Sequence, residues 1–270
     1  MIVCFVLLCI FLWSRRSYIN RKQTVLVTGG SSGLGLALVN RLISRGHTVY
    51  ILDIAEPPET LTGYAGNLVV DISSPECSLW ISMFLVDKPR IDTLICNAGV
   101  FRFGSLLAMS ESEIVSVFQT NVFGVMRCIK ACQPNLKLYV ISSEAVCLPQ
   151  AACTWPYVAS KRLLEDLAIT LRLELTTLPT VTIVRPGAMQ TPMLTGVVLK
   201  SDAVHKLTSL LARMWSSNPD DVAMKIVDSM EWVVSPDLLH IGHNPLLMLS
   251  RVFPAGIVRW VQGICMSMLS

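Results

Sequence analysis

Charged residues are scarce in this chain, since Asp, Glu, Lys and Arg together make up 15% of its 270 residues. The formal net charge is only +3, and no run of Lys and Arg residues occurs. Because binding along a nucleic-acid backbone needs a basic patch or stripe, nucleic acid is excluded as an expected partner. Repeats and low-complexity linkers are also missing, and 52% of the residues are hydrophobic. We therefore expect a single large domain around one core.

The cysteines lack the spacing that two kinds of site require. There are nine of them, scattered from Cys4 to Cys265, and no two form a C-x-x-C pair. Disulfide frameworks and zinc sites use paired cysteines, so neither is expected and no metal site is predicted. Cys128 and Cys132 would share a helical face, where we interpret them as small core residues. This pattern is typical of reduced thiols in a domain that faces the cytosol.

The hydrophobic residues are concentrated at the two ends of the chain. Residues 2–13 form an unbroken apolar run, followed by the basic residues Arg15, Arg16, Arg21 and Lys22. As a helix this run would be roughly 18 Å long, shorter than the roughly 30 Å hydrocarbon layer, so spanning the bilayer and lying in one leaflet both stay open. The charge follows the run, unlike in a cleaved signal peptide. Residues 1–23 are therefore expected to be a membrane anchor with a basic flank, and the rest of the chain to face the cytosol.

Residues 243–270 form a second apolar segment. They include Pro245 to Phe253 and Ile257 to Val261, interrupted by isolated arginines. This pattern is typical of a segment that lies on a membrane or covers an apolar pocket, and a core helix of the domain is an equal alternative. The two apolar ends together predict membrane association, at the endoplasmic reticulum or on lipid droplets.

Residues 24–242 alternate between strand and helix patterns. Strands are expected at residues 24–27, 48–52, 67–70, 91–96, 137–142, 181–184 and 238–241. Helices are expected over Gly35 to Leu42, after Ser74-Pro75, from about Glu111 to Cys132, from Tyr157 and after Asn218. The alternation predicts a doubly wound α/β domain of the Rossmann type. Its parallel sheet would be covered on both faces and would bind ligands at the carboxyl ends of its strands.

A glycine-rich loop, Thr28-Gly29-Gly30-Ser31-Ser32-Gly33-Leu34-Gly35, joins the first strand to the first helix. Such a loop allows a tight turn that brings a pyrophosphate to the helix N-terminus. Asp53 closes the second strand 18 residues beyond Gly35. Near this spacing a carboxylate binds the ribose 2′-hydroxyl of NAD and repels the 2′-phosphate of NADP. The loop and Asp53 therefore predict NAD rather than NADP as the cofactor, with an ordinary turn residue as the alternative for Asp53.

Tyr157 and Lys161 are four positions apart on an expected helix, so they share one face. The positive charge of Lys161 would lower the pKa of the phenol from its ordinary value of about 10. The tyrosine would then be a usable general acid or base. Taken alone, such a pair is more often an ordinary surface pair, and only its place among the other motifs changes this interpretation.

In their order and spacing these motifs resemble the short-chain dehydrogenase/reductase family over residues 24–242. The resemblance rests on the T-G-x-x-x-G-x-G loop, Asn97-Ala98-Gly99, Asn121, Ser143, Tyr157-x-x-x-Lys161, and Pro186-Gly187 with Thr191. It implies an oxidoreductase that uses NAD(P) on CH–OH groups. The apolar ends are most similar to those of the membrane-anchored steroid and retinol dehydrogenases.

The resemblance implies four catalytic residues. Tyr157 would take a proton from an alcohol or return it to a carbonyl, and Lys161 would lower the pKa of that tyrosine and bond the nicotinamide ribose. Ser143 would hold the substrate oxygen. Asn121 would support a water that links Lys161 to solvent.

One departure from the family pattern concerns Ser143, which precedes Tyr157 by 14 positions where many members have 13. A spacing of 13 would select Glu144, whose carboxylate would repel a developing alkoxide. We therefore prefer Ser143, with one extra residue in the following loop, and keep Ser142 as the alternative. The loop at residues 146–155 should line the substrate side.

The cofactor contacts implied by the resemblance follow the strand ends. The adenine would lie near Asp71 and Ile72, its ribose along residues 97–99, and the carboxamide near Gly187 and Thr191. The full predicted set is Thr28, Gly29, Ser31, Ser32, Gly33, Leu34, Gly35, Asp53, Asp71, Ile72, Asn97, Ala98, Gly99, Tyr157, Lys161, Pro186, Gly187 and Thr191.

Pro192 to Leu199 follow Thr191, and the helix expected after them is rich in Leu and Met through Met214. The substrate lid of the family occupies this place. These apolar residues favour a lipid-soluble alcohol or ketone, such as a steroid or retinoid. One alternative is an NADPH-dependent reductase of the ketosphinganine type, against which Asp53 argues. Another is a non-catalytic nucleotide-binding scaffold, against which the four catalytic residues argue. The family often dimerises through its two long helices, so a homodimer through about Glu111 to Cys132 and Tyr157 to Leu175 is a further expectation.

Overall fold

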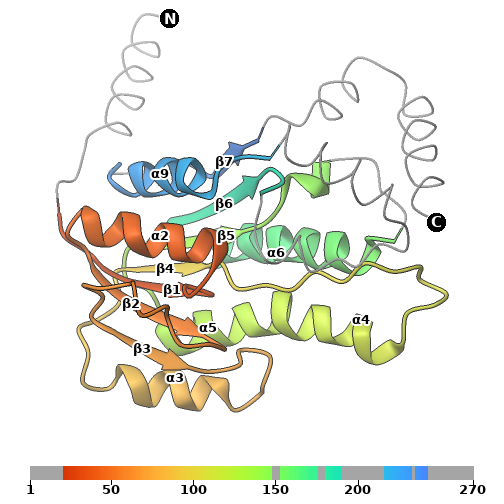
Figure 1. Ribbon diagram of the computed structural model, residues 1–270, viewed down its shortest axis with the longest axis horizontal. Helices are drawn as coiled ribbons and strands as arrows, with labels where there is room; N and C mark the ends of the chain where they lie inside the picture. The colour runs from red at the N-terminus through yellow and green to blue at the C-terminus, as the bar shows by residue number, and fades with distance from the viewer. Residues whose placement is uncertain (1–20, 148–152, 176–179, 190–215, 233–234, 243–270) are drawn as a thin grey trace, which may run out of the picture.

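The computed structural model describes residues 21–147, 153–175, 180–189, 216–232 and 235–242 (Figure 1). The expected anchor, Thr191, the expected lid and the C-terminal apolar segment lie outside these residues, except for positions 21–23 of the anchor's flank. Over the described ranges, no helix is long and apolar enough to cross a membrane.

The core of the fold is one sheet of seven parallel strands in the order β3-β2-β1-β4-β5-β6-β7. The strands are β1 (Thr24–Thr28), β2 (Thr48–Asp53), β3 (Gly66–Val69), β4 (Thr93–Cys96), β5 (Lys137–Ile141), β6 (Thr180–Pro186) and β7 (Leu238–Ile241). The strand order reverses between β1 and β4, and a crevice that can bind a ligand forms at such a point. The predicted single Rossmann-type α/β domain is confirmed.

Helices cover both faces of this sheet (Figure 1). On one face, α2 (Gly33–Ser44) and α9 (Pro219–Met230) lie side by side and bury leucine and valine side chains against β1, β2 and β5. On the other face lie α3 (Cys77–Leu85), α5 (Val125–Cys132) and α6 (Trp155–Glu174). The inner strands β1, β2, β4, β5 and β6 are therefore largely buried on both sides, as their continuous apolar runs require.

Capping residues explain where two of the helices begin. Ser110 caps α4 (Glu111–Phe118), because its Oγ accepts a hydrogen bond from the Glu113 amide while the Glu113 carboxylate accepts one from the Ser110 amide. Asn218 caps α9 by accepting from the Asp220 amide at 3.0 Å. The pair Ser74-Pro75 predicts that Ser74 caps the helix after β3, and this prediction is wrong. The Ser74 hydroxyl bonds to the Glu76 carboxylate instead, and α3 begins only at Cys77.

The expected helix from Glu111 to Cys132 contains a wider turn. Between α4 and α5, the segment η1 (Gln119–Gly124) has π-helical hydrogen bonding. Turns of this kind often mark functional positions in a helix. Here the turn carries Asn121, whose side chain is fully buried.

Two polar side chains of β5 form hydrogen bonds with the C-terminal part of the described chain. The buried Lys137 ammonium donates to the backbone carbonyls of Met230 and Trp232. The Tyr139 hydroxyl lies 3.0 Å from the hydroxyls of both Ser229 and Ser235. These contacts satisfy polar groups that burial would otherwise leave unpaired.

Candidate active site

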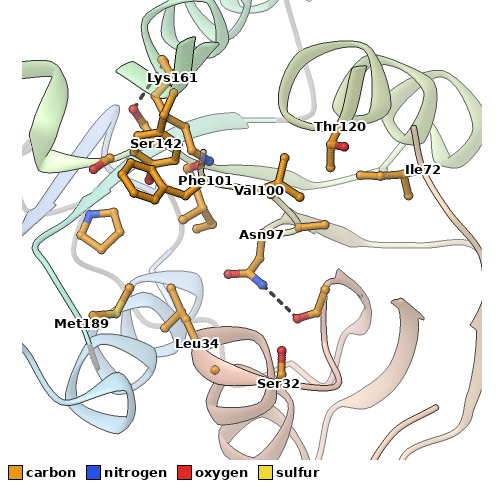
Figure 2. Close-up of a pocket in the computed structure, with 18 of the residues that line it drawn as sticks. Ser32, Leu34, Ile72, Asn97, Val100, Phe101, Thr120, Ser142, Lys161 and Met189 are labelled. Carbon is orange, nitrogen blue, oxygen red and sulfur yellow. Dashed lines mark hydrogen bonds between the residues drawn. The ribbon is translucent and has the colours of Figure 1, made fainter. Parts of the chain in front are cut away.

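A pocket of about 730 Å³ follows the carboxyl ends of the strands. In Figure 2 its glycine-loop end is marked by Ser32 and Leu34, and its opposite end by Phe101, Ser142 and Lys161. The predicted site residues that line it are Gly29, Ser32, Gly33, Leu34, Asp53, Asp71, Ile72, Asn97, Ala98, Gly99, Ser143, Tyr157, Lys161, Pro186 and Gly187. The structure thus brings most of the predicted set to one cavity.

The glycine loop packs closely against itself at the N-terminus of α2. A Cβ atom added to Gly35 would lie 1.8 Å from the carbonyl oxygen of Gly29, so only glycine fits there. Gly29 itself has a φ of 67°, in the left-handed region that favours glycine. The Asn97 side chain donates to the carbonyls of Thr28 and Gly29, each at 3.1 Å, and Figure 2 shows it directed at the loop.

Two predicted positions support this loop from beneath. The Thr28 hydroxyl is fully buried and accepts from the backbone amides of Asn97 and Ala98, each at 3.0 Å. The backbone amide of Ser31 donates to Asp53 Oδ2 at 2.8 Å. Thr28, Ser31 and Gly35 therefore build the loop, although they do not line the pocket.

Two carboxylates lie at the glycine-loop end of the pocket. Asp53 closes β2, and its Oδ1 also accepts from the Ala55 amide at 3.2 Å, which fixes the orientation of the carboxylate. Asp71 follows β3, is exposed, and accepts from the Ser73 amide at 2.8 Å. The glycine turn, the N-terminus of α2 and a carboxylate beyond β2 together fit the pyrophosphate and ribose of a dinucleotide. Among the described side chains, no group of three or more His, Cys, Asp or Glu could hold a metal ion.

Tyr157 and Lys161 lie on α6 at the opposite end of the pocket. Lys161 Nζ is 5.7 Å from the centre of the Tyr157 ring and donates to the Ile141 carbonyl at 2.9 Å. Burial lowers the pKa of Lys161 to about 8. Burial also raises the pKa of Tyr157, and a hydrogen bond with Ser143 offsets only part of that rise. The expected lowering of the Tyr157 pKa by Lys161 is therefore wrong for this geometry, because desolvation dominates.

The two serines at the end of β5 have different partners. Ser142 is buried, and its hydroxyl donates to Glu165 Oε1 at 2.6 Å. The Ser143 side chain hydrogen-bonds to Tyr157 instead. The structure thus brings Ser143 to Tyr157 and directs Ser142 to Glu165, further along the same helix α6. The turn η2 (Glu144–Cys147) follows Ser143 at once, and residues 148–152 of the loop expected on the substrate side lie outside the description.

Asn121 lies behind the pocket rather than in its lining. Its Oδ1 accepts from the Val100 amide at 2.7 Å, and its Nδ2 donates to the Val100 carbonyl at 2.9 Å and to Ser160 Oγ at 3.0 Å. A Cβ added to Gly99 would lie 3.1 Å from Asn121 Oδ1 and 3.4 Å from Lys161 Nζ. Asn121 thus fixes the strand end beside Lys161.

Several residues at the Tyr157 end of the pocket, called the reacting end below, were not predicted from the sequence. The Phe101 ring packs edge-on against the Tyr157 ring, with 4.9 Å between ring centres. Glu165 pairs with Arg185 through two hydrogen bonds, at 2.8 and 2.6 Å. The position of Glu165 one turn beyond Lys161 on the same helix face could have revealed it. The position of Phe101 two residues after Gly99 is too weak a signal.

Comparison with known proteins agrees with this geometry. The profile of the family described as short chain dehydrogenase matches residues 23–201. Human 17-beta-hydroxysteroid dehydrogenase type 1 is 32% identical over 130 residues, which cover 43% of this chain and 39% of that protein. The 3-dehydrosphinganine reductase TSC10A of Arabidopsis thaliana is 28% identical over 228 residues, 78% of this chain and 69% of that protein.

A further relative and a solved structure complete the comparison. The 3-ketodihydrosphingosine reductase of Bacteroides thetaiotaomicron is 33% identical over 118 residues, 43% of each chain, so this chain spans less than half the length of several curated relatives that it matches. A short-chain dehydrogenase structure from Streptomyces avermitilis has a TM-score of 0.71 at 23% identity, covers 92% of this chain and 96% of its own, and shows the same fold. Because the family profile extends from the first strand through the tyrosine helix and Pro186-Gly187, this chain belongs to the short-chain dehydrogenase family.

Proposed function

We propose that this protein is an oxidoreductase that transfers a hydride between NAD(H) and a lipophilic alcohol or ketone, such as a steroid or retinoid. The observation that carries the proposal is the contact of Ser143 with Tyr157 beside the buried Lys161, at the far end of a pocket that begins at a dinucleotide loop. The family provides the reaction class, and the side chains provide the mechanism below.

The nicotinamide group, when bound, supplies or accepts the hydride. The Tyr157 hydroxyl gives a proton to the carbonyl oxygen in reduction and takes it from the alcohol in oxidation. Ser143 donates a hydrogen bond to the same oxygen, where negative charge develops. The Lys161 ammonium favours the phenolate electrostatically once proton transfer begins. Because burial raises the pKa of Tyr157, the phenol holds its proton at neutral pH, as carbonyl reduction requires.

The choice of NAD over NADP rests on Asp53. Its carboxylate is oriented by the Ser31 and Ala55 amides at the end of the pocket where an adenosine ribose would lie. Two hydroxyls of a ribose can bond to a carboxylate, whereas a 2′-phosphate would be repelled. Among the described residues that line the pocket, the cationic side chains are Arg102 and Lys161, and Lys161 belongs to the tyrosine end.

A second candidate is a reductase of 3-ketosphinganine-like lipids. It is favoured by the relatives named 3-ketodihydrosphingosine and 3-dehydrosphinganine reductase, one of which matches 78% of this chain. Both candidates share the residues and the chemistry, and they differ in substrate and cofactor. Turnover of a long-chain ketone with NADPH in preference to NADH would select the second candidate.

We also propose that the chain is membrane-associated, at the endoplasmic reticulum or on lipid droplets, with the catalytic domain facing the cytosol. The support is the apolar run at residues 2–13 with the basic residues that follow it. Fractionation of cells that express the full chain, followed by protease protection, tests this arrangement. Recovery in the soluble fraction would contradict it.

We propose a homodimer in addition, because the neighbouring helices α4 and α6 leave large apolar side chains exposed. They are Val115 on α4, and Trp155, Leu163, Ile169 and Leu173 on α6. Light scattering of the protein in detergent should give twice the chain mass, and a monomer at micromolar concentration would contradict the proposal.

The decisive experiment screens steroid, retinoid and long-chain alcohols and ketones with each cofactor, using the purified full chain. Tyr157→Phe should lower turnover at least about a thousandfold while NADH binding, followed by fluorescence, stays within about threefold. Tyr64→Phe is the matched control, because that ring lies outside the pocket lining. Full turnover in Tyr157→Phe would refute the mechanism, and NADH binding without any turnover would favour a non-catalytic scaffold.

A further inference from the structure

The Glu144 side chain is an acidic group in the wall of the reacting end. Glu144 follows Ser143 directly, and it lines the pocket although only 3% of its surface is exposed. Its Oε1 lies 3.1 Å from Nε2 of His240, a residue of β7. The contact joins the turn that carries Ser143 to a strand 96 residues later.

Two glycines provide the space for this carboxylate. A Cβ added to Gly242 would lie 2.7 Å from Glu144 Oε2, and one added to Gly187 would lie 3.1 Å from it. Gly187 follows β6 and Gly242 follows β7, so the carboxylate lies where the ends of three adjacent strands meet. A side chain at either position would displace it. The backbone is therefore shaped around a carboxylate at this point.

A carboxylate close to the reacting oxygen would oppose the proposed chemistry. Negative charge near a reacting oxygen disfavours both an alkoxide and a tyrosine phenolate. Ser143, the neighbour of Glu144, already contacts Tyr157, and burial alone makes that phenol harder to ionise. The contact with His240 directs one oxygen of the carboxylate to β7.

We propose that His240 is a positioning residue that holds the Glu144 carboxylate away from the Ser143–Tyr157 pair. This inference rests on the proposed function, because it assigns His240 a role in the same site. His240 acts through Glu144, and the same contact ties the turn after Ser143 to the edge of the sheet. Among the described residues, titratable or charged groups at the Tyr157 end of the pocket include Lys161, Glu144 and Arg102. Cys96 lies near Lys161, and His240 contacts Glu144.

The test compares four variants of the full chain. His240→Leu should remove the contact that directs the carboxylate to β7 and lower kcat by on the order of tenfold, with a smaller change in KM. His240→Gln, whose amide can still donate to the carboxylate, should keep kcat within about threefold of the parent. Glu144→Gln in the His240→Leu background should restore kcat to within about threefold of Glu144→Gln alone. Damage through lost packing alone would predict no such rescue, because the second substitution restores no volume.

A second readout needs no substrate. Phenolate absorbance, taken as the difference from Tyr157→Phe, follows the ionisation of Tyr157 with pH. His240→Leu should move this ionisation to higher pH, and the double variant should move it back. Thermal unfolding of each variant separates this effect from loss of fold, and Glu174→Gln, an exposed carboxylate change, is the matched control.

Parental kcat and parental Tyr157 ionisation in His240→Leu would overturn the role of His240, and so would a double variant no better than His240→Leu. Absence of turnover in the parent would refute the proposed function instead. In that event the absorbance titration still decides the role of His240.

Discussion

Removing Arg185 should destabilise the whole domain, because its guanidinium neutralises a carboxylate inside the fold. Glu165 has 10% of its side chain exposed, and Arg185 has 23%. Breaking a buried pair by removing one partner costs about 3–5 kcal/mol. Arg185 keeps some contact with solvent and Ser142 still donates to Glu165, so we expect a loss just below this range, about 2–3 kcal/mol for Arg185→Met.

The assay is urea denaturation at neutral pH, together with a thermal scan. A loss of about 2–3 kcal/mol corresponds to a fall in Tm of about 4–10 °C for a domain of this size. Glu165→Gln in the Arg185→Met background should recover at least half of the loss, because the unpaired charge is gone while an acceptor for Ser142 remains. Arg90→Met, at an exposed arginine, is the control. A loss below about 0.5 kcal/mol in Arg185→Met, or no recovery in the double variant, would refute this reasoning.

Three further predictions concern the cofactor loop and the pH dependence of stability. Gly35→Ala should weaken NADH binding by more than about tenfold, because its Cβ would overlap the Gly29 carbonyl oxygen, whereas Gly66→Ala, with 3.5 Å to its nearest neighbour, should bind as the parent does in a fluorescence titration. Asp53→Asn should reduce the ratio of NADP to NAD dissociation constants by about tenfold or more, and an unchanged ratio would remove the argument for NAD. Burial lowers the pKa of Lys137 to about 8, below the about 10.4 of an unfolded lysine, so the unfolded chain binds more protons between these values and the free energy of unfolding should rise with pH across that window. In Lys137→Met, the free energy of unfolding measured by urea titration should rise less between pH 8 and pH 10 than in the parent. An equal rise in both proteins would contradict the lowered pKa of Lys137.

Patterns of local spacing predicted the fold well, because apolar runs of strand length and the turn residues between them are local properties. The parallel direction of the strands also followed from the alternation of strands and helices, since parallel strands need crossover helices. The wider turn at Asn121 and the late start of α3 were not predictable in this way. Each depends on which of several possible partners a polar group bonds to. Ser74, for example, bonds to the Glu76 carboxylate instead of capping the helix.

The site was predictable where residues act near one another in sequence. Thr28 to Gly35, and Tyr157 with Lys161, each lie within one turn or one helix face. The direction of the Tyr157 pKa shift was not predictable, because desolvation depends on everything that packs around the ring, including Phe101. Likewise, the sequence shows that a carboxylate at Glu144 would repel a developing alkoxide. It does not show the partner of this carboxylate, because His240 lies on a strand far along the chain.

The long-range contacts of β5 also bear on how the chain reaches this fold. Lys137, Tyr139 and Glu144 all find partners 90 to 96 residues later, in α9, β7 or the residues between them. Until those elements dock, a collapsed β5 would bury polar groups without partners, at about 1–3 kcal/mol each. Partly folded states that contain β5 but lack the C-terminal elements are therefore disfavoured, and the two parts should fold in one cooperative step. Release of a nascent chain before β7 is synthesised would leave β5, and with it the tyrosine helix, without a stable place to pack.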